Sequence, residues 1–231
     1  MVLNLVLVES AVELVPKDLR AHPSVRAWAV RRGRSAETIL LERSYHHAAM
    51  VKEGLITGRR GRPDIAYLCI LEALGTPLSR EGQLRFFLHT FQDMIAEIPA
   101  STRVPRSYER FRGLLEQLLV EGRVPTSGNP LITIMKKSLR ELKEEIRPDL
   151  TVALTTRGNP MSAESIAKEA TGYRNPAFIV GGFAQGNFSE ETVQLADSLI
   201  RIDRETLDSQ IVVARLVYEY EKALGMSEKR L

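Results

Sequence analysis

The most constraining feature of this sequence is a repeated order of apolar run, polar loop and helical pattern in its last third. Compact apolar runs cover 151–155, 177–180 and 198–202, and helical patterns cover 162–170 and 207–224. Strands that are buried on both faces are continuous apolar runs, and parallel strands need a crossover helix between them. The pattern therefore predicts an α/β fold with a mainly parallel sheet flanked by helices, and ligand-binding loops at the carboxyl ends of the strands.

Further elements are expected in the first two thirds of the chain. Apolar runs at 3–8, 84–89 and 94–98 predict three strands. The segment 65–74 is apolar almost all round, which suits a buried helix, and Pro63 stands where a first helical residue is favoured. A second helix is expected between Ser107 and Gly122, because apolar residues recur there every three or four positions.

Length and composition predict a soluble, cytoplasmic protein with one large domain or two small ones. The 231 residues are 44% hydrophobic, which is enough to bury a full core. The single cysteine, Cys69, cannot form an intramolecular disulfide, and the first residues lack the features of a signal peptide. No apolar run approaches the roughly 20 residues that a membrane-spanning helix needs.

The arginines are concentrated in three clusters, although the net charge is only +3. The clusters are Arg31, Arg32 and Arg34; Arg59, Arg60 and Arg62; and Arg103, Arg106, Arg110 and Arg112. One such cluster alone is most often solvated surface. A planar guanidinium nevertheless suits bidentate phosphate recognition, so three clusters together favour contacts with nucleic-acid phosphates.

A glycine-rich loop follows the apolar run 177–180 and is a candidate ligand site. Glycine lets a backbone approach a ligand closely, and Gly181, Gly182 and Gly186 provide this freedom. Their spacing fits neither the dinucleotide-binding pattern nor a P-loop, and such a turn is also common without any ligand. The histidines and the cysteine lack the spacing of a metal site, and no signature of a serine or cysteine nucleophile is present.

Six short segments, spread over most of the chain, form a specific combination. They are Ser44-Tyr45-His46-His47, Gly61-Arg62-Pro63-Asp64-Ile65, Thr76-Pro77-Leu78, Leu88-His89-Thr90, Ile179-Val180-Gly181-Gly182, and the spacing Arg103-x-x-Arg106-x-x-x-Arg110-Phe111. The combination resembles the pseudouridine N1-methyltransferase family of ribosome biogenesis, which belongs to the SPOUT class. This resemblance implies a single SPOUT domain over residues 1–231, with a C-terminal trefoil knot from about residue 150 that binds S-adenosyl-L-methionine.

The resemblance also implies an activity and partners. The expected reaction transfers a methyl group from S-adenosylmethionine to N1 of a pseudouridine in small-subunit rRNA, with a role in small-subunit biogenesis. The expected partners are this rRNA, a second copy of the chain in a homodimer, and ribosomal proteins or assembly factors, but no membrane. A sulfonium is a good leaving group, so alignment of the reacting atoms supplies most of the catalysis. A base could remove the N1 proton; Asp64 is a candidate for it, but no catalytic residue is assigned.

The RNA-binding residues that the resemblance implies are arginines. Arg62 is expected to contact the rRNA while Asp64 holds its guanidinium, and Arg103, Arg106 and Arg110 are expected to complete the RNA surface. A guanidinium that is already fixed loses less rotamer entropy when it grips a phosphate. Asp64 would also complement the positive end of its helix, and Arg110 would equally suit a solvated helix face.

The cofactor residues that the resemblance implies lie in two loops, and residues 154–158 are expected to shape a further one. The cofactor-binding residues are Gly181 and Gly186 in the second loop, and Ile202, Asp203, Arg204, Glu205, Thr206 and Leu207 in the third. No metal is expected. The sequence departs from the family at two places. Gln185 stands where many relatives carry a histidine, and residues 203–206 replace an Asn-Tyr-Pro-like segment, so side-chain roles there are open.

Two alternatives share the same arginines. The chain could be an rRNA-binding assembly factor with little catalytic role, or a SPOUT methyltransferase that acts on another RNA base. A cofactor pocket distinguishes the first alternative, whereas fold alone does not determine the substrate. The segment 211–217 is apolar nearly all round, which predicts that its helix packs on the core and also contributes to a homodimer interface.

Overall fold

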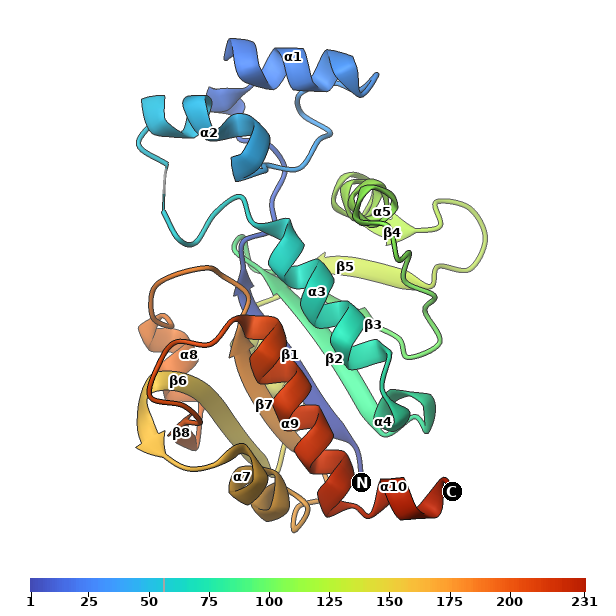
Figure 1. The fold of residues 1–231 in the computed structure, drawn as a ribbon. Helices are drawn as coiled ribbons and strands as arrows, with labels where there is room; N and C mark the ends of the chain where they lie inside the picture. The colour runs from blue at the N-terminus through green and yellow to red at the C-terminus, as the bar shows by residue number, and fades with distance from the viewer. Residues whose placement is uncertain (56) are drawn as a thin grey trace.

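A mixed β-sheet forms the centre of the molecule (Figure 1). The computed structural model describes residues 1–55 and 57–231, in which the strand order is β4-β5-β3-β2-β1-β7-β6-β8. The strands from β2 to β8 in this order are parallel, and β3, β5 and β4 extend the sheet in antiparallel fashion. The strands are β1 Leu3–Ser10, β2 Leu84–Thr90, β3 Met94–Ile98, β4 Arg123–Val124, β5 Ile132–Lys136, β6 Leu150–Pro160, β7 Pro176–Gly181 and β8 Ser198–Arg201.

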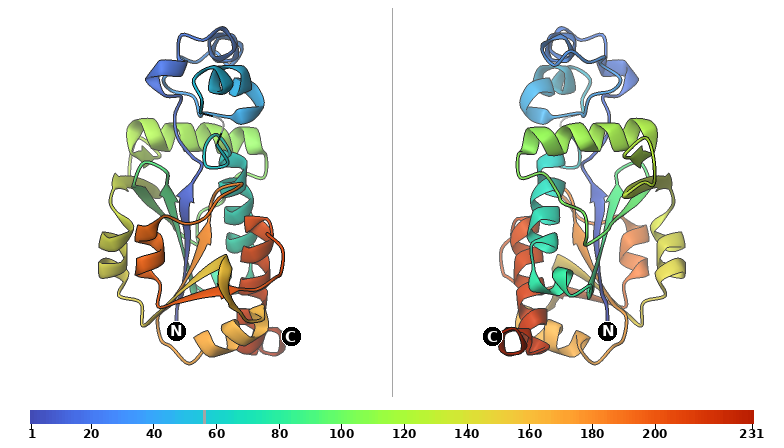
Figure 2. Two further views of the ribbon diagram at one scale, coloured as in Figure 1. Left: turned by 90° about the vertical axis from the view of Figure 1, so that its left-hand side faces the viewer. Right: turned by 90° about the vertical axis from the view of Figure 1, so that its right-hand side faces the viewer.

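Helices cover both faces of the sheet (Figure 2). α3 and α9 lie side by side on one face, with α7 packed against α9, and α6 and α8 lie on the other face. α1 and α2 project beyond the end of the sheet, above α5. The helices are α1 Pro23–Arg31, α2 Arg43–Lys52, α3 Pro63–Leu74, α4 Pro77–Arg80, α5 Tyr108–Glu121, α6 Leu139–Ile146, α7 Ala163–Ala170, α8 Glu190–Leu195, α9 Ser209–Ala223 and α10 Met226–Lys229.

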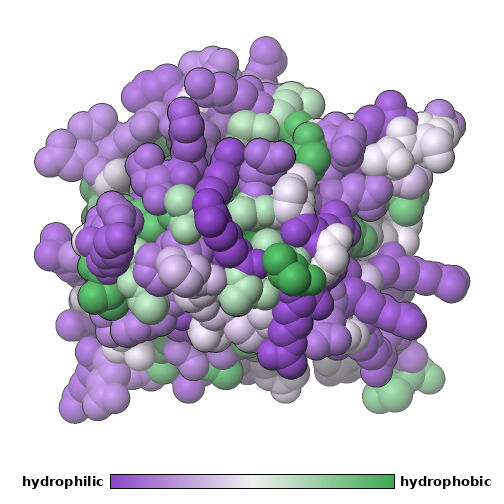
Figure 3. Space-filling model, turned by 90° about the horizontal axis from the view of Figure 1, so that it is seen from above, coloured by the Kyte–Doolittle hydropathy of each residue, from purple (hydrophilic) through white to green (hydrophobic). Residues whose placement is uncertain are grey.

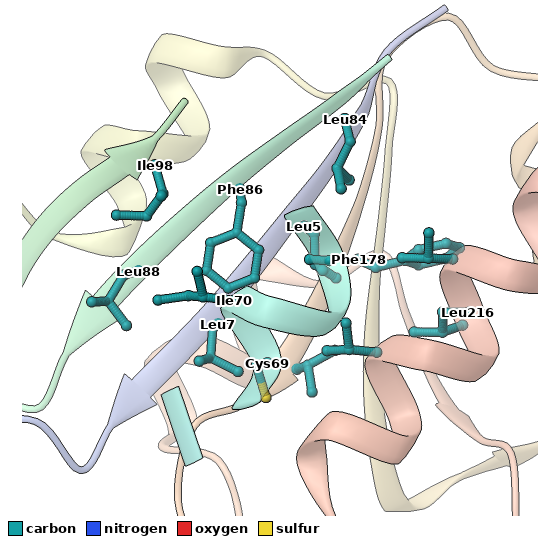
Figure 4. Close-up of a cluster of buried hydrophobic side chains, with 14 of the residues drawn as sticks. Leu5, Leu7, Cys69, Ile70, Leu84, Phe86, Leu88, Ile98, Phe178 and Leu216 are labelled. Atoms are coloured by element: carbon teal, nitrogen blue, oxygen red, sulfur yellow. The ribbon is translucent and has the colours of Figure 1, made fainter. Parts of the chain in front are cut away.

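The central strand β1 supplies side chains to two separate cores. All its residues are buried, and successive side chains of a strand point to opposite faces. Leu5 and Leu7 point toward α3, where Figure 4 shows them beside Cys69, in a core that also includes α9. Val6 and Val8 point the other way and pack with residues of α6 and α8. One apolar strand therefore fixes both helical layers.

A third, smaller core lies within the α1–α2 projection. Val25, Leu41 and Met50 are among its fully buried residues. On its edge the rings of Trp28 and Tyr45 stack, with centroids 3.6 Å apart and an interplanar angle of 11°. The projection therefore has an apolar centre of its own, although it is an insertion between β1 and α3.

Ion pairs attach this projection to α5. Arg32 donates through both terminal nitrogens to the buried carboxylate of Glu116, with an Nη2–Oε2 distance of 2.8 Å. The buried Glu42 accepts a hydrogen bond of 2.7 Å from the Tyr108 hydroxyl and lies 3.4 Å from Nη1 of Arg112. Hydrogen-bonded charges satisfy one another in a buried setting, so these contacts fix the projection relative to α5.

Most of the predicted elements are confirmed. The strands at 3–8, 84–89 and 94–98 are β1, β2 and β3, the buried helix at 65–74 is α3, and the helix between Ser107 and Gly122 is α5. The three strands of the last third are β6, β7 and β8, and they are parallel as predicted. A mainly parallel sheet with helices on both faces therefore follows the pattern in the sequence.

Three features differ from the predictions. Residues 156–160 were expected to form a loop, but β6 continues through them, because the chain bulges after Leu154 and pairs with β8 again at Asn159. The final helix begins at Ser209 rather than at 207, and α10 follows it after Gly225, whose φ is 65°. The antiparallel strand β5 and the helices α1, α2, α6 and α8 were not predicted, because their apolar runs are short.

The buried His46 makes stability depend on pH. Burial and the nearby Arg32 charge lower the pKa of His46 from 6.5 to about 4. Between these values the unfolded chain binds a proton that the folded chain does not, so the free energy of unfolding should fall as pH drops from about 6.5 to about 4. The contribution is at most about 1.4 kcal/mol per pH unit.

The matched variant is His46→Asn, which keeps an acceptor near the Glu42 N–H that now donates to Nδ1 of His46 at 3.0 Å. Urea unfolding between pH 7 and pH 4 should show a shallower pH dependence for this variant than for the wild type. Parallel pH profiles would contradict the assignment to His46.

Candidate functional site

A cavity of about 610 Å³ opens where β7 and β8 end and where β6 bulges. Its lining comes from three chain segments, within residues 154–156, 180–188 and 200–212, and from the start of α3. This volume is within the range of pockets that enclose a small ligand. The loops that the sequence predicted as ligand-binding thus meet at one place, at the carboxyl ends of parallel strands.

The first of these segments is shaped by a close approach of two strands. Thr155 and Thr156 line the cavity, whereas Gly158 does not. A Cβ at Gly158 would lie 2.5 Å from the backbone nitrogen of Ile200. Gly158 is therefore needed for packing of β6 against β8, and the expectation that residues 154–158 all shape the first loop is corrected to 154–156.

The second segment contains both glycines that the sequence singled out as cofactor-binding. Gly181 lines the cavity, and its carbonyl accepts a hydrogen bond of 2.6 Å from the Ser209 hydroxyl. Gly186 also lines the cavity and has a φ of 115°, which a side chain would disfavour. A Cβ at the intervening Gly182 would lie 2.8 Å from Cα of Ser10, so this glycine allows contact with β1.

The third segment follows β8 and is bent by its own polar contacts. Ile202, Asp203, Glu205, Thr206 and Leu207 line the cavity. The Glu205 N–H donates to the Asp203 carboxylate at 3.1 Å, which lowers the pKa of Asp203. The remaining predicted residue of this loop, Arg204, is exposed and lies outside the lining.

Arg62 and Asp64 form an ion pair at the rim of the cavity. Nε of Arg62 lies 2.8 Å from Oδ1 of Asp64, and Nη2 lies 2.7 Å from Oδ2. The hydrogen bond to Asp64 raises the pKa of Arg62. Both side chains are partly exposed, and Arg62 lines the cavity, so its guanidinium is held in one orientation beside the predicted cofactor loops.

Arg103, Arg106 and Arg110 are all exposed, around the start of α5. The first two precede the helix, and Arg110 lies in its first turn. Tyr67 of α3 donates its hydroxyl proton to the carbonyl of Arg106, which ties this segment to the helix that begins after Arg62. The three arginines therefore surround a loop and the start of a helix.

Other arginines of the three clusters have structural roles. Arg32, Arg59, Arg60 and Arg112 form ion pairs with Glu116, Glu9, Glu13 and Glu42, all of them buried glutamates. The inference from clustered arginines to phosphate contacts therefore applies to fewer residues than the sequence suggested. These long-range pairs had no signal in the local sequence.

Several residues of the cavity were not identified from the sequence. They are Phe183, Phe188, Asp208, Ser209 and Gln210, together with Ile65 and Leu68 of α3. Phe183 and Phe188 meet edge to face, with ring centroids 6.0 Å apart.

Among the described residues, no His, Cys, Asp and Glu side chains group into a possible metal site. No helix in this part of the chain has the length and apolar character to cross a membrane.

The architecture is shared with a solved structure. The crystal structure of Archaeoglobus fulgidus Nep1 bound to S-adenosylhomocysteine matches with a TM-score of 0.84 and 32% identity, over 97% of this chain and 100% of that chain. The chain therefore has the SPOUT-type methyltransferase fold. A family model described as EMG1/NEP1 methyltransferase matches residues 5–221. The chain belongs to the EMG1/NEP1 methyltransferase family.

Curated relatives match over at least nine tenths of their length. The ribosomal RNA small subunit methyltransferase Nep1 of Thermococcus kodakarensis is 39% identical over 225 residues, which cover 97% of this chain and 100% of that protein. The protein of the same name from Staphylothermus marinus is 38% identical over 216 residues, 93% of each chain. The likeness thus includes the α1–α2 projection as well as the cavity.

The tight contact at Gly158 predicts a loss of stability when a methyl group is added there. Gly158→Ala should lower the free energy of unfolding by about 1–3 kcal/mol, because the β8 backbone must move. The matched control is Gly113→Ala in α5, where a Cβ would meet nothing within 4 Å and alanine favours the helix by up to about 1 kcal/mol. Urea unfolding measures both variants. Equal stability of Gly158→Ala and Gly113→Ala would contradict the interpretation.

Proposed function

We propose that this protein transfers a methyl group from S-adenosylmethionine to N1 of a pseudouridine in small-subunit rRNA. The observation that carries the proposal is the cavity lined by three loops at the carboxyl ends of β6, β7 and β8, in a chain of this family. The relatives named above are small-subunit rRNA methyltransferases, and the similar structure holds S-adenosylhomocysteine. Residues 1–231 act as one cytoplasmic domain, with the cofactor part and its trefoil knot from about residue 150.

The residues around the cavity fit the cofactor. The backbone at Gly181 and Gly186 is open to a ligand, and Leu154, Val180 and Leu207 provide apolar surface suitable for an adenine ring. The carboxylates of Asp203, Glu205 and Asp208 lie in the same lining and suit a ligand with an ammonium and a sulfonium. When bound, S-adenosylmethionine supplies a methyl group on a sulfonium that is already a good leaving group, so positioning by these loops is the main catalytic task.

The exposed arginines suit the RNA. Arg62 is fixed by Asp64 at the rim of the cavity, next to where a target base must enter. Arg103, Arg106 and Arg110 surround the start of α5, where Ser107 forms no side-chain cap and helix N–H groups can also meet phosphate. Seen from the end that carries α1 and α2, hydrophilic residues cover most of the surface (Figure 3). A target base would have to leave its stack to reach the site.

Asp64 is better suited to positioning than to proton transfer. Both of its oxygens already accept hydrogen bonds from Arg62, at 2.8 Å and 2.7 Å. A base that removed the N1 proton would have to release this arginine first. We therefore assign Asp64 the task of holding Arg62.

The proposal is tested by methyl transfer from labelled S-adenosylmethionine to two matched RNA hairpins that carry either uridine or pseudouridine at one position. We expect label in the pseudouridine hairpin only, because uridine has its glycosidic bond at N1. Transfer to both hairpins would indicate a different target base. Tight cofactor and RNA binding without transfer would indicate an assembly factor instead of an enzyme.

The RNA surface predicts a specific effect of arginine removal. Arg106→Ala and Arg110→Ala should each weaken binding of a cognate hairpin by about 1 kcal/mol and lower the magnitude of the salt slope by about one. Cofactor affinity should be unchanged. Arg140→Ala, an exposed arginine on α6 on the opposite face, is the matched control. Wild-type affinity and salt dependence in the first two variants would rule out this surface.

A homodimer is the assembly that we propose, and the exposed side of α9 with the adjoining α3 is its interface. Tyr218 is 61% exposed and Ile211 42% exposed on α9, and Leu68 of α3 is 39% exposed. Sedimentation at micromolar concentration should give a dimer, and Tyr218→Glu should weaken it by burying a charge. Val30→Glu, at a residue 79% exposed on α1, is the control. A wild-type monomer would contradict the prediction.

A further inference from the structure

Arg59 lies next to the second loop of the cavity and is not among the residues that line it. Its guanidinium donates to the carbonyl of Asn187 and lies over the ring of Phe183, with a distance of 4.1 Å to the ring centroid. A Cβ at Gly186 would lie 3.4 Å from Cδ of Arg59, so this side chain runs directly beneath the turn. Arg59 thus contacts the loop at three residues, Phe183, Gly186 and Asn187, without lining the cavity itself.

Ala184 and Phe188 of the loop pack against the cores, but the loop makes few hydrogen bonds to the rest of the chain. Among the described residues, the hydrogen bonds made to 183–188 come from two neighbours in the sequence, Gly58 and Arg59. The Gly58 carbonyl accepts from the N–H groups of Ala184 and Gln185, at 2.9 Å and 3.3 Å. The described residues make no other hydrogen bonds to this loop. Its shape therefore depends in large part on the segment that contains Gly58 and Arg59.

Glu9 holds Arg59 in place. Its buried carboxylate forms an ion pair with Arg59 through one oxygen. The other oxygen accepts hydrogen bonds from the Ser189 N–H at 2.9 Å and the Thr192 hydroxyl at 2.6 Å, at the start of α8. Glu9 reaches this position because its φ is 51°, a left-handed conformation that is uncommon for a residue with a side chain.

We propose that Arg59 and Glu9 are positioning residues that hold the cofactor loop 183–188 in its binding shape. The inference rests on the proposed function, since it concerns the same cavity. A loop that is already fixed loses less conformational entropy when a ligand binds, so the pair acts on cofactor affinity. Neither side chain lines the cavity, which separates their role from direct contact with the ligand.

The test compares Arg59→Met with Arg60→Met. Arg60 is also paired with a buried carboxylate, that of Glu13, with contacts of 2.7 Å and 2.6 Å, but it makes no hydrogen bond to the loop. Calorimetry with S-adenosylhomocysteine should show about tenfold weaker binding for Arg59→Met, because this variant loses a charge-assisted hydrogen bond to the loop. Arg60→Met should bind with wild-type affinity. Wild-type affinity in Arg59→Met, or equal weakening in both variants, would overturn the inference.

Kinetics and the partner residue give an independent readout. Arg59→Met should raise the KM for S-adenosylmethionine while kcat and the KM for RNA stay unchanged, which general destabilisation would not produce.

Glu9→Gln keeps an acceptor for Ser189 and Thr192 but loses the charge that holds Arg59, so it should weaken cofactor binding similarly. Because the two residues act as one unit, the double variant should bind the cofactor no more weakly than Arg59→Met does. Additive losses of affinity would contradict the pairing.

Failure of the proposed function can be told apart from failure of this inference. If the wild type binds no S-adenosylhomocysteine, the proposed function fails. Hydrogen exchange of the Ala184 and Gln185 amides in the cofactor-free protein then still tests the positioning role. Faster exchange in Arg59→Met than in Arg60→Met supports it, and equal exchange overturns it.

Discussion

The strand β1 is buried on both faces, and the rest of the molecule is arranged around it. Its two sets of side chains anchor α3 with α9 on one side and α6 with α8 on the other. Its last residues then lead out of the sheet and support the cavity. Ser10 packs against Gly182, and the carboxylate of Glu9 contacts the start of α8. The same strand therefore determines the layers of the fold and supports the loops that line the cavity.

Electrostatic pairing divides the arginines into two groups. Buried glutamates hold Arg32, Arg59, Arg60 and Arg112, and each pair is protected from water, where an unpaired charge would be costly. The exposed arginines near α5 have no such partner among the described residues and can meet phosphate. Arg62 is intermediate, because its pair with Asp64 is accessible and orients the guanidinium without burying it.

The glycines near the cavity have different tasks. Gly186 has a backbone conformation that suits glycine and belongs to the lining of the cavity. Gly58 and Gly182 instead allow two pieces of backbone to meet, since a Cβ at either position would lie less than 3.0 Å from backbone atoms of another segment. The same glycine-rich segment therefore contains glycines that allow close backbone packing and a glycine that lines the cavity.

The sequence by itself determined the elements whose cause is local. Apolar runs predict β1 and the three strands of the last third. Pro63 and Gly75 mark the limits of α3, and Ser107 and Gly122 mark those of α5. The pair of Arg62 and Asp64 is also local, because two residues at a helix start can meet without the rest of the fold.

Only the tertiary structure decided which of the remaining residues meet. Arg59 pairs with Glu9 across 50 positions, and Glu9 contacts Ser189 across 180. The α1–α2 projection, the continuation of β6 to Pro160 and the division of arginines into paired and exposed groups depend in the same way on distant contacts. Such contacts form only after the chain has closed long loops, so their energy leaves no periodic pattern in the sequence.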